Sequence, residues 1–144
     1  MKYRYLLIDN DNTLMDFHAA EHAALREALT EAGIEPTDAV CARYSAINDA
    51  LWKALERGET THAALKIARF AQLLAEYPAE NVCAPRLALR YSHYLGTHAD
   101  LMPDAEAFLR RLHGQMKIVL VSNGDSVIQR NRLSRCVFTP LLDN

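Results

Sequence analysis

The sequence lacks the features that would place it in several special classes of protein. It contains no run of about 18 or more apolar residues, so we expect no segment that spans a membrane. Its formal net charge is only −2, and the absence of a strong basic field argues against nucleic acid as the main partner. The first residues lead through a short apolar run into acidic residues, which is not the pattern of a secretory signal peptide.

Cysteine is scarce as well. The sequence has three cysteines, at the widely separated positions Cys41, Cys83 and Cys136. An odd and dispersed set favours neither a disulfide framework nor a zinc site, and a reduced cytosol is the default for such a chain. None of the three has neighbours that suggest a nucleophile. We therefore predict buried structural thiols in a cytoplasmic protein.

The hydrophobic content is high enough for a substantial core. Half of the 144 residues are hydrophobic, which fits one domain or a small domain that carries an insertion. Two short apolar segments, residues 3–8 and 117–121, have the composition of buried strands. Asp16 is placed to cap a helix over residues 17–32, and Ser126 begins a predicted helix that ends near Arg135.

The distribution of predicted helices indicates two parts. Residues 17–96 are predicted to be helical throughout, with breaks at prolines and glycines, and this block is too long for an ordinary crossover between parallel strands. We predict an α/β fold in which residues 1–16 and 97–144 form a core with a parallel sheet. The helical residues 17–96 would be an inserted subdomain, or cap, that sits over the site.

A polar cluster follows each predicted strand. The clusters consist of Asp9, Asp11 and Thr13 after the first strand, and of Ser122, Asn123 and Gly124 after the second. In open α/β sheets ligands bind beyond the carboxyl ends of the strands. Two parallel strands that end at the same edge would therefore form one site from distant parts of the sequence.

The residue types in these clusters suit phosphoryl chemistry. Two neighbouring carboxylates repel each other, so a divalent cation such as Mg²⁺ would favour keeping both ionised. A carboxylate can attack phosphorus to form an aspartyl phosphate, and a second acid can move protons. The hydroxyl of Ser122 and the amides of Asn123 and Gly124 can hold phosphate oxygens, and the glycine relieves the steric limits of that turn. Taken alone, the acidic pair also fits an ordinary capped turn.

Taken together, the two clusters resemble the motifs of the haloacid dehalogenase-like (HAD) hydrolase superfamily. The first motif, Asp-x-Asp-x-Thr, is matched by Asp9, Asp11 and Thr13, and Ser122 matches the second, a hydroxyl residue that closes a hydrophobic strand. The segments most similar to the bacterial 5'-nucleotidase and pyrimidine-nucleotidase branch are residues 1–17, Leu51-Trp52, Arg57-Gly58-Glu59 and residues 119–124. The resemblance implies a Rossmannoid core with a helical cap inserted after the first motif.

The resemblance also implies a role for each matching residue. Asp9 would be the nucleophile and Asp11 the acid/base, and both would bind Mg²⁺, Asp11 through its backbone carbonyl. Ser122 would hold the transferring phosphoryl group, assisted by Asn123 and by the other members of the two clusters, Thr13 and Gly124. The implied substrate is a small phosphate monoester, with nucleoside monophosphates the more specific expectation. Asn12 stands where many members of the superfamily have Asp or Gly.

Two later motifs of the superfamily have no counterpart. One is a lysine that neutralises the phosphoryl charge, and the other is an acidic pair that completes the Mg²⁺ site. The only lysines are Lys2, Lys53, Lys66 and Lys117, and none follows Ser122. Without the strands that accompany these motifs, residues 3–8 would expose an open apolar edge, and we expect catalysis by this chain alone to be impaired.

Three interpretations of this departure stay open. The chain could be the N-terminal part of a phosphatase, or a natural short protein that has lost catalysis and binds phosphate compounds or a partner. It could also complete its sheet edge with a second copy, as a homodimer. A phosphate-receiving signalling domain also uses an acidic cluster with Mg²⁺, but its short crossovers do not match the long helical block.

Other residues are expected to be structural. Arg130, Arg132 and Arg135, on the last predicted helix, are expected to be surface charges. The aromatic residues of the helical block are expected in its core, although such a residue could stack on a nucleobase. These aromatic residues are Trp52, Phe70 and Tyr77.

Overall fold

The computed structural model describes residues 2–144 and divides into two compact units. One unit comprises the chain up to Glu21 together with Leu95–Asn144, and the other comprises His22–Tyr94. The sequence predicted a division after residue 16 and before residue 97, and the interpretation of the helical part as a cap stays a prediction. None of the described helices is both long and apolar enough to cross a membrane.

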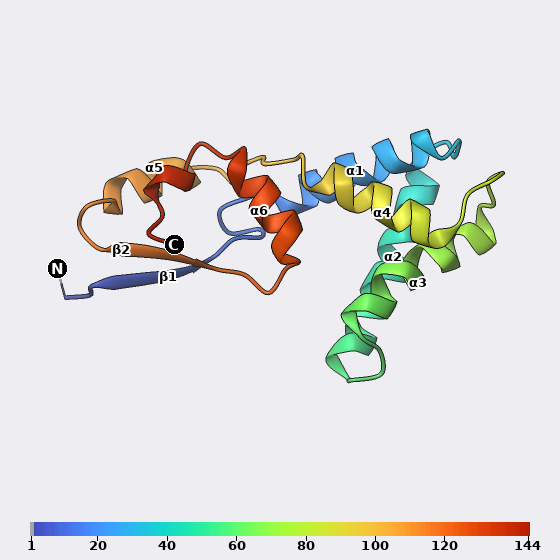
Figure 1. The fold of residues 1–144 in the computed structure, drawn as a ribbon, viewed down its shortest axis with the longest axis horizontal. Helices are drawn as coiled ribbons and strands as arrows, with labels where there is room; N and C mark the ends of the chain where they lie inside the picture. The colour runs from blue at the N-terminus through green and yellow to red at the C-terminus, as the bar shows by residue number, and fades with distance from the viewer. Residues whose placement is uncertain (1) are drawn as a thin grey trace. The chain divides into compact units, whose positions relative to one another are not determined.

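A long helical stretch separates the two strands of a small sheet, and further helices follow the second strand (Figure 1). This arrangement confirms the predicted α/β class. In chain order the elements are β1 (Tyr5–Asp9), α1 (Phe17–Glu31), α2 (Asp38–Glu56), α3 (His62–Glu76), α4 (Ala84–Leu95), α5 (Ala105–Leu112), β2 (Lys117–Val121), α6 (Ser126–Ser134) and the 3-10 helix η1 (Thr139–Leu141). The predicted strands at residues 3–8 and 117–121 and the predicted helices at residues 17–32 and from Ser126 to near Arg135 agree with β1, β2, α1 and α6 to within a few residues, and α1 to α4 occupy the block predicted to be helical.

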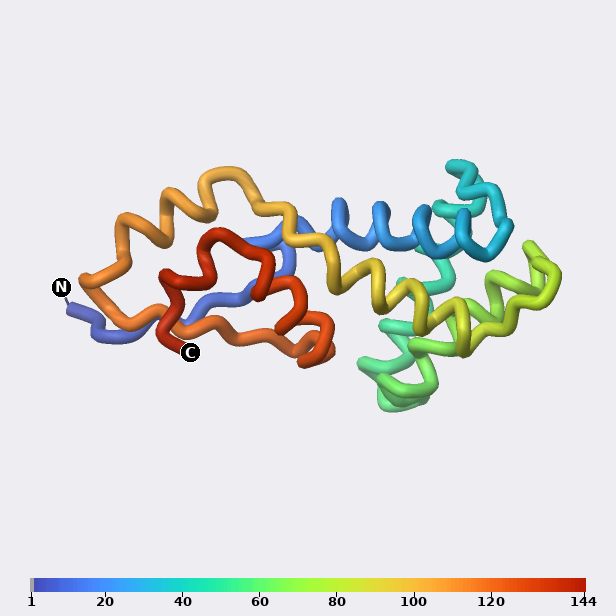
Figure 2. The backbone as a smooth tube through the Cα atoms, turned by 45° about the horizontal axis from the view of Figure 1, so that its top comes forward, coloured from blue at the N-terminus to red at the C-terminus, as the bar shows by residue number. Residues whose placement is uncertain are grey.

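The sheet consists of β1 and β2, which run parallel and lie side by side in both views (Figure 2). Their register pairs Tyr5 with Lys117 at one end and Asp9 with Val121 at the other. The carboxyl ends of the two strands are therefore neighbours. The loops that follow them start from the same edge of the sheet.

The prediction that residues 3–8 form a buried strand is wrong for one face of β1. Tyr5 and Leu7 are 62% and 68% exposed, whereas Leu6 and Ile8 point to the core and are partly buried. Within the described residues β1 pairs only with β2, so its outer edge and one face remain in solvent. The expected open apolar edge is thus present, and such an edge is a ready template for pairing with another strand.

The other edge of the sheet is occupied by the last residues of the chain. Asp143 donates its amide to the carbonyl of Ile118 at 2.7 Å, and its carboxylate accepts the amide of Ile118 at 2.7 Å. The side chain of Asn144 bonds both the amide and the carbonyl of Leu120, at 3.0 and 2.9 Å. These bonds satisfy backbone groups of β2 that would otherwise face solvent.

The core of this unit lies on one side of the sheet, beneath α5 and the C-terminal segment (Figure 1). Its buried members come from the loop after β1, from α5, from β2 and from the segment around η1. They are Leu14, Met15, Ala105, Leu109, Ile118, Cys136, Phe138 and Leu141. Burial raises the pKa of the Cys136 thiol. Burial of this apolar surface holds the strands against α5 and so fixes the sheet edge.

The helical unit has an aromatic core of its own. The rings of Tyr44, Phe70 and Tyr91 are buried, with centroids 5.3 to 6.0 Å apart. Thr37 and Thr61 cap α2 and α3 by accepting backbone amides three residues on. Phe70 is in the core as predicted, but Trp52 is 37% exposed and packs edge-on against His62, so its core prediction is wrong.

All three cysteines are free thiols. Cys41 and Cys136 are buried as predicted, but Cys83 is exposed. Cys83 immediately precedes α4, and its carbonyl accepts the amide of Leu87 in the first turn of the helix at 3.1 Å. The prediction of a buried thiol is therefore wrong at that position.

Candidate functional site

The loop after β1 is tightly folded around the buried residue Asn10. Its carbonyl accepts the amides of Thr13, Leu14 and Met15 at 3.2, 2.9 and 3.0 Å. Asn12 has a left-handed backbone, with φ of +58°, a conformation that asparagine and glycine tolerate better than most residues. This backbone geometry gives a physical reason for Asn at a position where Gly or Asp also fits.

The same loop is fastened to the start of α1. The Oδ1 atom of Asn12 accepts the amides of Phe17 and His18 at 3.0 and 3.3 Å. Asp16 accepts the amide of Ala19 at 2.9 Å, which agrees with its predicted capping role. The acidic loop is thus held between the end of β1 and the first turn of α1.

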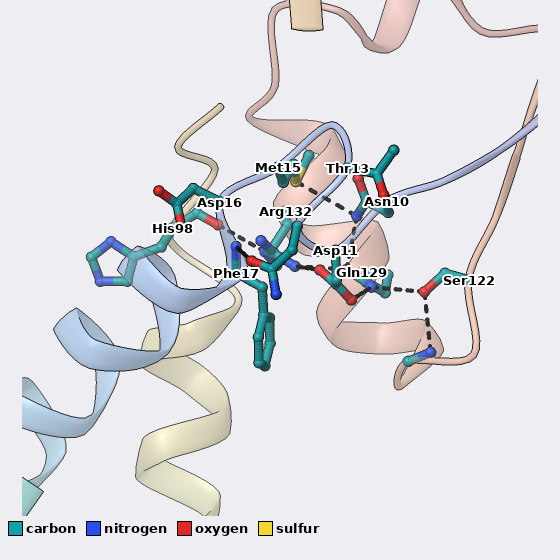
Figure 3. Close-up of polar contacts among 12 residues, drawn as sticks. Asn10, Asp11, Thr13, Met15, Asp16, Phe17, His98, Ser122, Gln129 and Arg132 are labelled. Atoms are coloured by element: carbon teal, nitrogen blue, oxygen red, sulfur yellow. Dashed lines mark hydrogen bonds and ion pairs between the residues drawn. The ribbon is translucent and has the colours of Figure 1, made fainter. Parts of the chain in front are cut away.

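Asp9 and Asp11 face different partners. Asp9 is the last residue of β1 and is exposed, and its Oδ2 atom accepts the hydroxyl of Thr13 at 3.4 Å. The carboxylate of Asp11 turns toward α6 instead (Figure 3). Its Oδ1 atom accepts Nη1 of Arg132 at 2.5 Å, and its Oδ2 atom accepts Nε2 of Gln129 at 2.6 Å.

Ser122 lies beside this cluster, directly after β2. Its Oγ atom accepts Nε2 of Gln129 at 2.9 Å and the amide of Gly124 at 3.1 Å. A serine hydroxyl has two acceptor positions and one donor hydrogen, so the hydrogen of Ser122 remains to donate elsewhere. Figure 3 shows Gln129 between Asp11 and Ser122, so one side chain joins the two loops.

The glycine after Ser122 serves close packing rather than an unusual backbone. Gly124 is not among the residues with positive φ, so the expected relief of turn strain is not the reason for it. A Cβ atom at this position would lie 2.8 Å from Nε2 of Gln129. The absence of a side chain lets Gln129 reach Asp11 and Ser122. Asn123, between Ser122 and Gly124, is exposed.

Sequence reasoning missed both α6 residues of the cluster. Arg130 and Arg135 are exposed as predicted, but Arg132 is completely buried, so its prediction as a surface charge is wrong. Gln129 was not singled out at all, although it is 7% exposed. The available signal was their spacing of three residues, on a helix that starts directly after the second polar cluster.

The acidic groups do not form a complete metal cage. Among the described residues, no group of three or more His, Cys, Asp or Glu side chains is placed to hold a metal ion. Asp9 offers a carboxylate at the sheet edge, whereas that of Asp11 is already engaged by Arg132 and Gln129.

Known proteins with similar sequences are HAD hydrolases and nucleotidases. The chain is 37% identical over 132 residues to YfnB of Bacillus subtilis, whose name assigns it to the HAD hydrolases, covering 92% of this chain and 56% of YfnB. It is 34% identical over 141 residues to the pyrimidine 5'-nucleotidase PynA of Streptococcus pneumoniae, covering 97% of this chain and 59% of PynA. No family model matches the chain.

The fold agrees with these sequence relatives. A crystal structure of YfnB bound to magnesium superposes with a TM-score of 0.92 at 34% identity, covering 99% of this chain and 62% of YfnB. An L-2-haloacid dehalogenase of Xanthobacter autotrophicus shares the fold at 17% identity, with a TM-score of 0.64 over 97% of this chain and 54% of the dehalogenase. The chain spans somewhat more than half the length of the curated relatives it matches. By sequence and by fold, the chain belongs to the haloacid dehalogenase-like hydrolase superfamily.

Proposed function

We propose that the chain carries the nucleophilic part of a Mg²⁺-dependent phosphomonoester hydrolase. The observation that supports this most is the strand register, which brings the Asp9 loop beside Ser122 at one sheet edge. Asp9 is exposed there, and the hydroxyl hydrogen of Ser122 is not used by its two partners. The proposed nucleophile and the proposed phosphate-binding donor, which come from distant parts of the sequence, thus follow strands that end at one edge of the sheet.

The proposed reaction has two displacement steps. In the first step Asp11 is protonated: an oxygen of Asp9 attacks phosphorus, the bond from phosphorus to the ester oxygen breaks, and Asp11 gives its proton to the leaving alkoxide. In the second step Asp11 takes a proton from water, and the water oxygen attacks the phosphorus of the aspartyl phosphate. The bond between phosphorus and Asp9 breaks, inorganic phosphate departs, and Asp9 is again a free carboxylate. Ser122 and the amide of Asn123 hold the phosphoryl oxygens, the amide of Gly124 orients the Ser122 hydroxyl by donating to its Oγ atom, and Thr13 orients Asp9 through its own hydroxyl.

The oxygen donors of the Asp9 loop fit a magnesium ion in kind. Mg²⁺ binds proteins through one or two carboxylates and keeps several waters, so a full cage of acidic groups is not required. Asp9 would supply its carboxylate and Asp11 its backbone carbonyl, because the side chain of Asp11 is turned toward Arg132 and Gln129. When bound, the ion would offset negative charge on the phosphoryl group.

The proposed substrates are small phosphate monoesters, with nucleoside monophosphates the first to test. Two curated relatives, PynA and the 26% identical YjjG of Escherichia coli, are named pyrimidine 5'-nucleotidases. Neither nucleic acid nor a membrane is proposed as a partner. The free thiols fit the proposed cytoplasmic location. The open edge of β1 would be the contact surface of a proposed homodimer, which sedimentation analysis can detect.

One component of the expected machinery is absent from the described part of the site. Lys117 lies at the opposite end of the sheet, paired with Tyr5, and Arg132, a buried cation beside the loop, is bonded to Asp11 rather than to Asp9. Electrostatic groups of this kind stabilise phosphoryl-transfer transition states strongly. We therefore expect little or no turnover from residues 1–144 alone.

The test is phosphate release from an aryl phosphate and from nucleoside monophosphates. The protein is expressed from its own coding sequence, read to the stop codon, and assayed with Mg²⁺ and with a chelator. We expect hydrolysis only with Mg²⁺ and a loss of about 10³-fold or more in Asp9→Asn, because an amide cannot replace the attacking carboxylate. Hydrolysis that survives Asp9→Asn would contradict the nucleophile assignment.

A further inference from the structure

Helix α6 contributes two buried polar side chains that the proposed reaction does not use. Gln129 and Arg132 are separated by three residues and therefore lie on one face of the helix. Asp125 caps α6 by accepting the amides of Val127 and Ile128 at 3.0 and 3.2 Å, which fixes the start of the helix next to Ser122. This cap sets the position of both side chains relative to the loop after β2.

Arg132 is held by three kinds of contact. Its Nε atom donates to the backbone carbonyl of His98 at 3.0 Å, and its guanidinium carbon lies 5.7 Å from the ring centroid of Phe17. Its Nη1 atom donates to Asp11 and, at 3.1 Å, to Oε1 of Gln129. A planar guanidinium that is fixed at Nε and along its face can direct Nη1 in only one way.

The amide of Gln129 is fully used, and its orientation is decided by its partners. The two hydrogens of Nε2 go to Asp11 and Ser122, which both accept, and Oε1 accepts from Asn10 at 3.2 Å and from Arg132. If the oxygen and nitrogen were exchanged, donors would face donors and acceptors would face acceptors. The network therefore permits only one orientation of this side chain.

These contacts fix the carboxylate of Asp11 without exhausting it. Each oxygen accepts one donor from α6, and a carboxylate has about four acceptor sites in total. Each oxygen thus keeps capacity for a proton of substrate or water. The side chain of Asp11 is 25% exposed whereas that of Arg132 is 1% exposed, so the pair presents its acidic end to solvent.

We propose that Arg132 is a positioning residue that sets the orientation of the Asp11 carboxylate, with Gln129 linking that orientation to Ser122. This role rests on the proposed function, because it assigns Asp11 to proton transfer. A buried ion pair contributes little net stability, since desolvation offsets the attraction, so its benefit here is the fixed geometry. Arg132 acts through Asp11 and does not touch the substrate.

The test separates kcat from KM in variants at this position. Arg132→Gln, Arg132→Lys and the exposed control Arg135→Gln are compared in the protein read from its own coding sequence, with Mg²⁺ and an aryl phosphate. We expect Arg132→Gln to lower kcat about 10- to 100-fold with little change in KM, since misplaced catalytic groups have effects of this size. Arg132→Lys should recover part of the lost kcat, because lysine keeps the positive charge but lacks the planar guanidinium with its donors in fixed directions. Arg135→Gln should equal the wild type.

Each outcome decides the inference. Wild-type kcat in well-folded Arg132→Gln overturns the positioning role and leaves the proposed function standing. Absence of Mg²⁺-dependent hydrolysis in the wild type overturns both. If Arg132→Gln does not fold, Gln129→Met removes both donors at similar volume. It should lower kcat with the same preserved KM, and wild-type kcat in this variant overturns the inference.

Discussion

Each unit of the molecule buries an arginine, and the two arginines have different partners. In the helical unit Arg69 is 8% exposed, lies 4.7 Å from the ring centroid of Tyr91, and donates to Oδ1 of Asn48 at 3.2 Å. In the sheet-containing unit Arg132 is fully buried and pairs with the carboxylate of Asp11. One guanidinium rests on neutral and aromatic groups, and the other holds an acid at the edge of the sheet.

The difference shows that burial alone does not identify a functional residue. The surroundings of Arg69 belong to the aromatic core of the helical unit, where a cation over a ring is a packing interaction. Arg132 instead bonds to Asp11, which lies more than a hundred residues away in the sequence. The exposed Asp9, the proposed nucleophile, directly precedes the loop that contains Asp11. The position of the acid partner is what distinguishes the two.

The largest expected effect is a difference in folding stability between variants of the two acids of the loop. Asp11→Asn removes the charge that Arg132 faces, and we expect a loss of about 2–3 kcal/mol, less than for a fully buried pair because Asp11 is partly exposed. Asp9→Asn is the matched control and should change stability by less than about 0.5 kcal/mol. Urea unfolding of both variants measures the free energy of unfolding. Equal losses in the two variants would show that the Asp11–Arg132 pair contributes no more to stability than the contacts of Asp9.

A smaller effect is expected where Gly124 meets Gln129. In Gly124→Ala the new Cβ would lie 2.8 Å from Nε2 of a side chain that four hydrogen bonds hold in place. We expect kcat to fall about tenfold, as for other changes in groups that orient a catalytic residue. Ser126→Ala, at an exposed position two residues on, is the control. Unchanged kcat in Gly124→Ala would mean that the Gln129 contacts can shift without consequence.

The contrasting arginine should tolerate replacement. Arg69→Met keeps a long side chain in the aromatic core and removes a charge whose partners, among the residues that the structure describes, are an amide and aromatic rings, so we expect a change in stability of about 1 kcal/mol or less. Activity should stay within about twofold of the wild type, which a kinetic assay beside Arg132→Gln can show. A loss of kcat as large as that of Arg132→Gln would remove the distinction between the two arginines.

The smallest effect concerns the pH dependence of the helical unit. Hydrogen bonds from Tyr94 and Arg90 lower the pKa of Glu31 below its ordinary value. The stability from these bonds is therefore present above the unfolded-state pKa, about 4.3, and is lost as the pH falls through the lower folded-state pKa. Urea midpoints between about pH 5 and pH 3 should fall more steeply for the wild type than for Glu31→Gln. Parallel curves would contradict this.

The sequence predicted the elements well because their ends are marked by local chemistry. Asp16, Thr37 and Thr61 accept the first amides of their helices, and Gly33 and Gly58 follow helix ends with positive φ. These signals depend on a few neighbouring residues. The same holds for the two strand-end clusters, which the parallel register brings together.

The features that could not be predicted from the sequence depend on tertiary contacts. The exposure of Tyr5 and Leu7 follows from the absence of a second neighbour for β1 among the described residues, which no local pattern records. The burial of Arg132 follows from the packing of α6 against the loop of Asp11 and the carbonyl of His98. An arginine on a polar helix looks like a surface charge until the partner loop is placed.

The central claim is that Asp9 becomes phosphorylated during turnover. The most direct measurement is mass spectrometry of the protein, read from its own coding sequence, after acid quenching of the reaction with an aryl phosphate and Mg²⁺. The proposed mechanism predicts one added phosphoryl group on the peptide that contains Asp9, removable by hydroxylamine and absent in Asp9→Asn. Steady hydrolysis with no phosphorylated form of that peptide, or with the group on another residue, would contradict it.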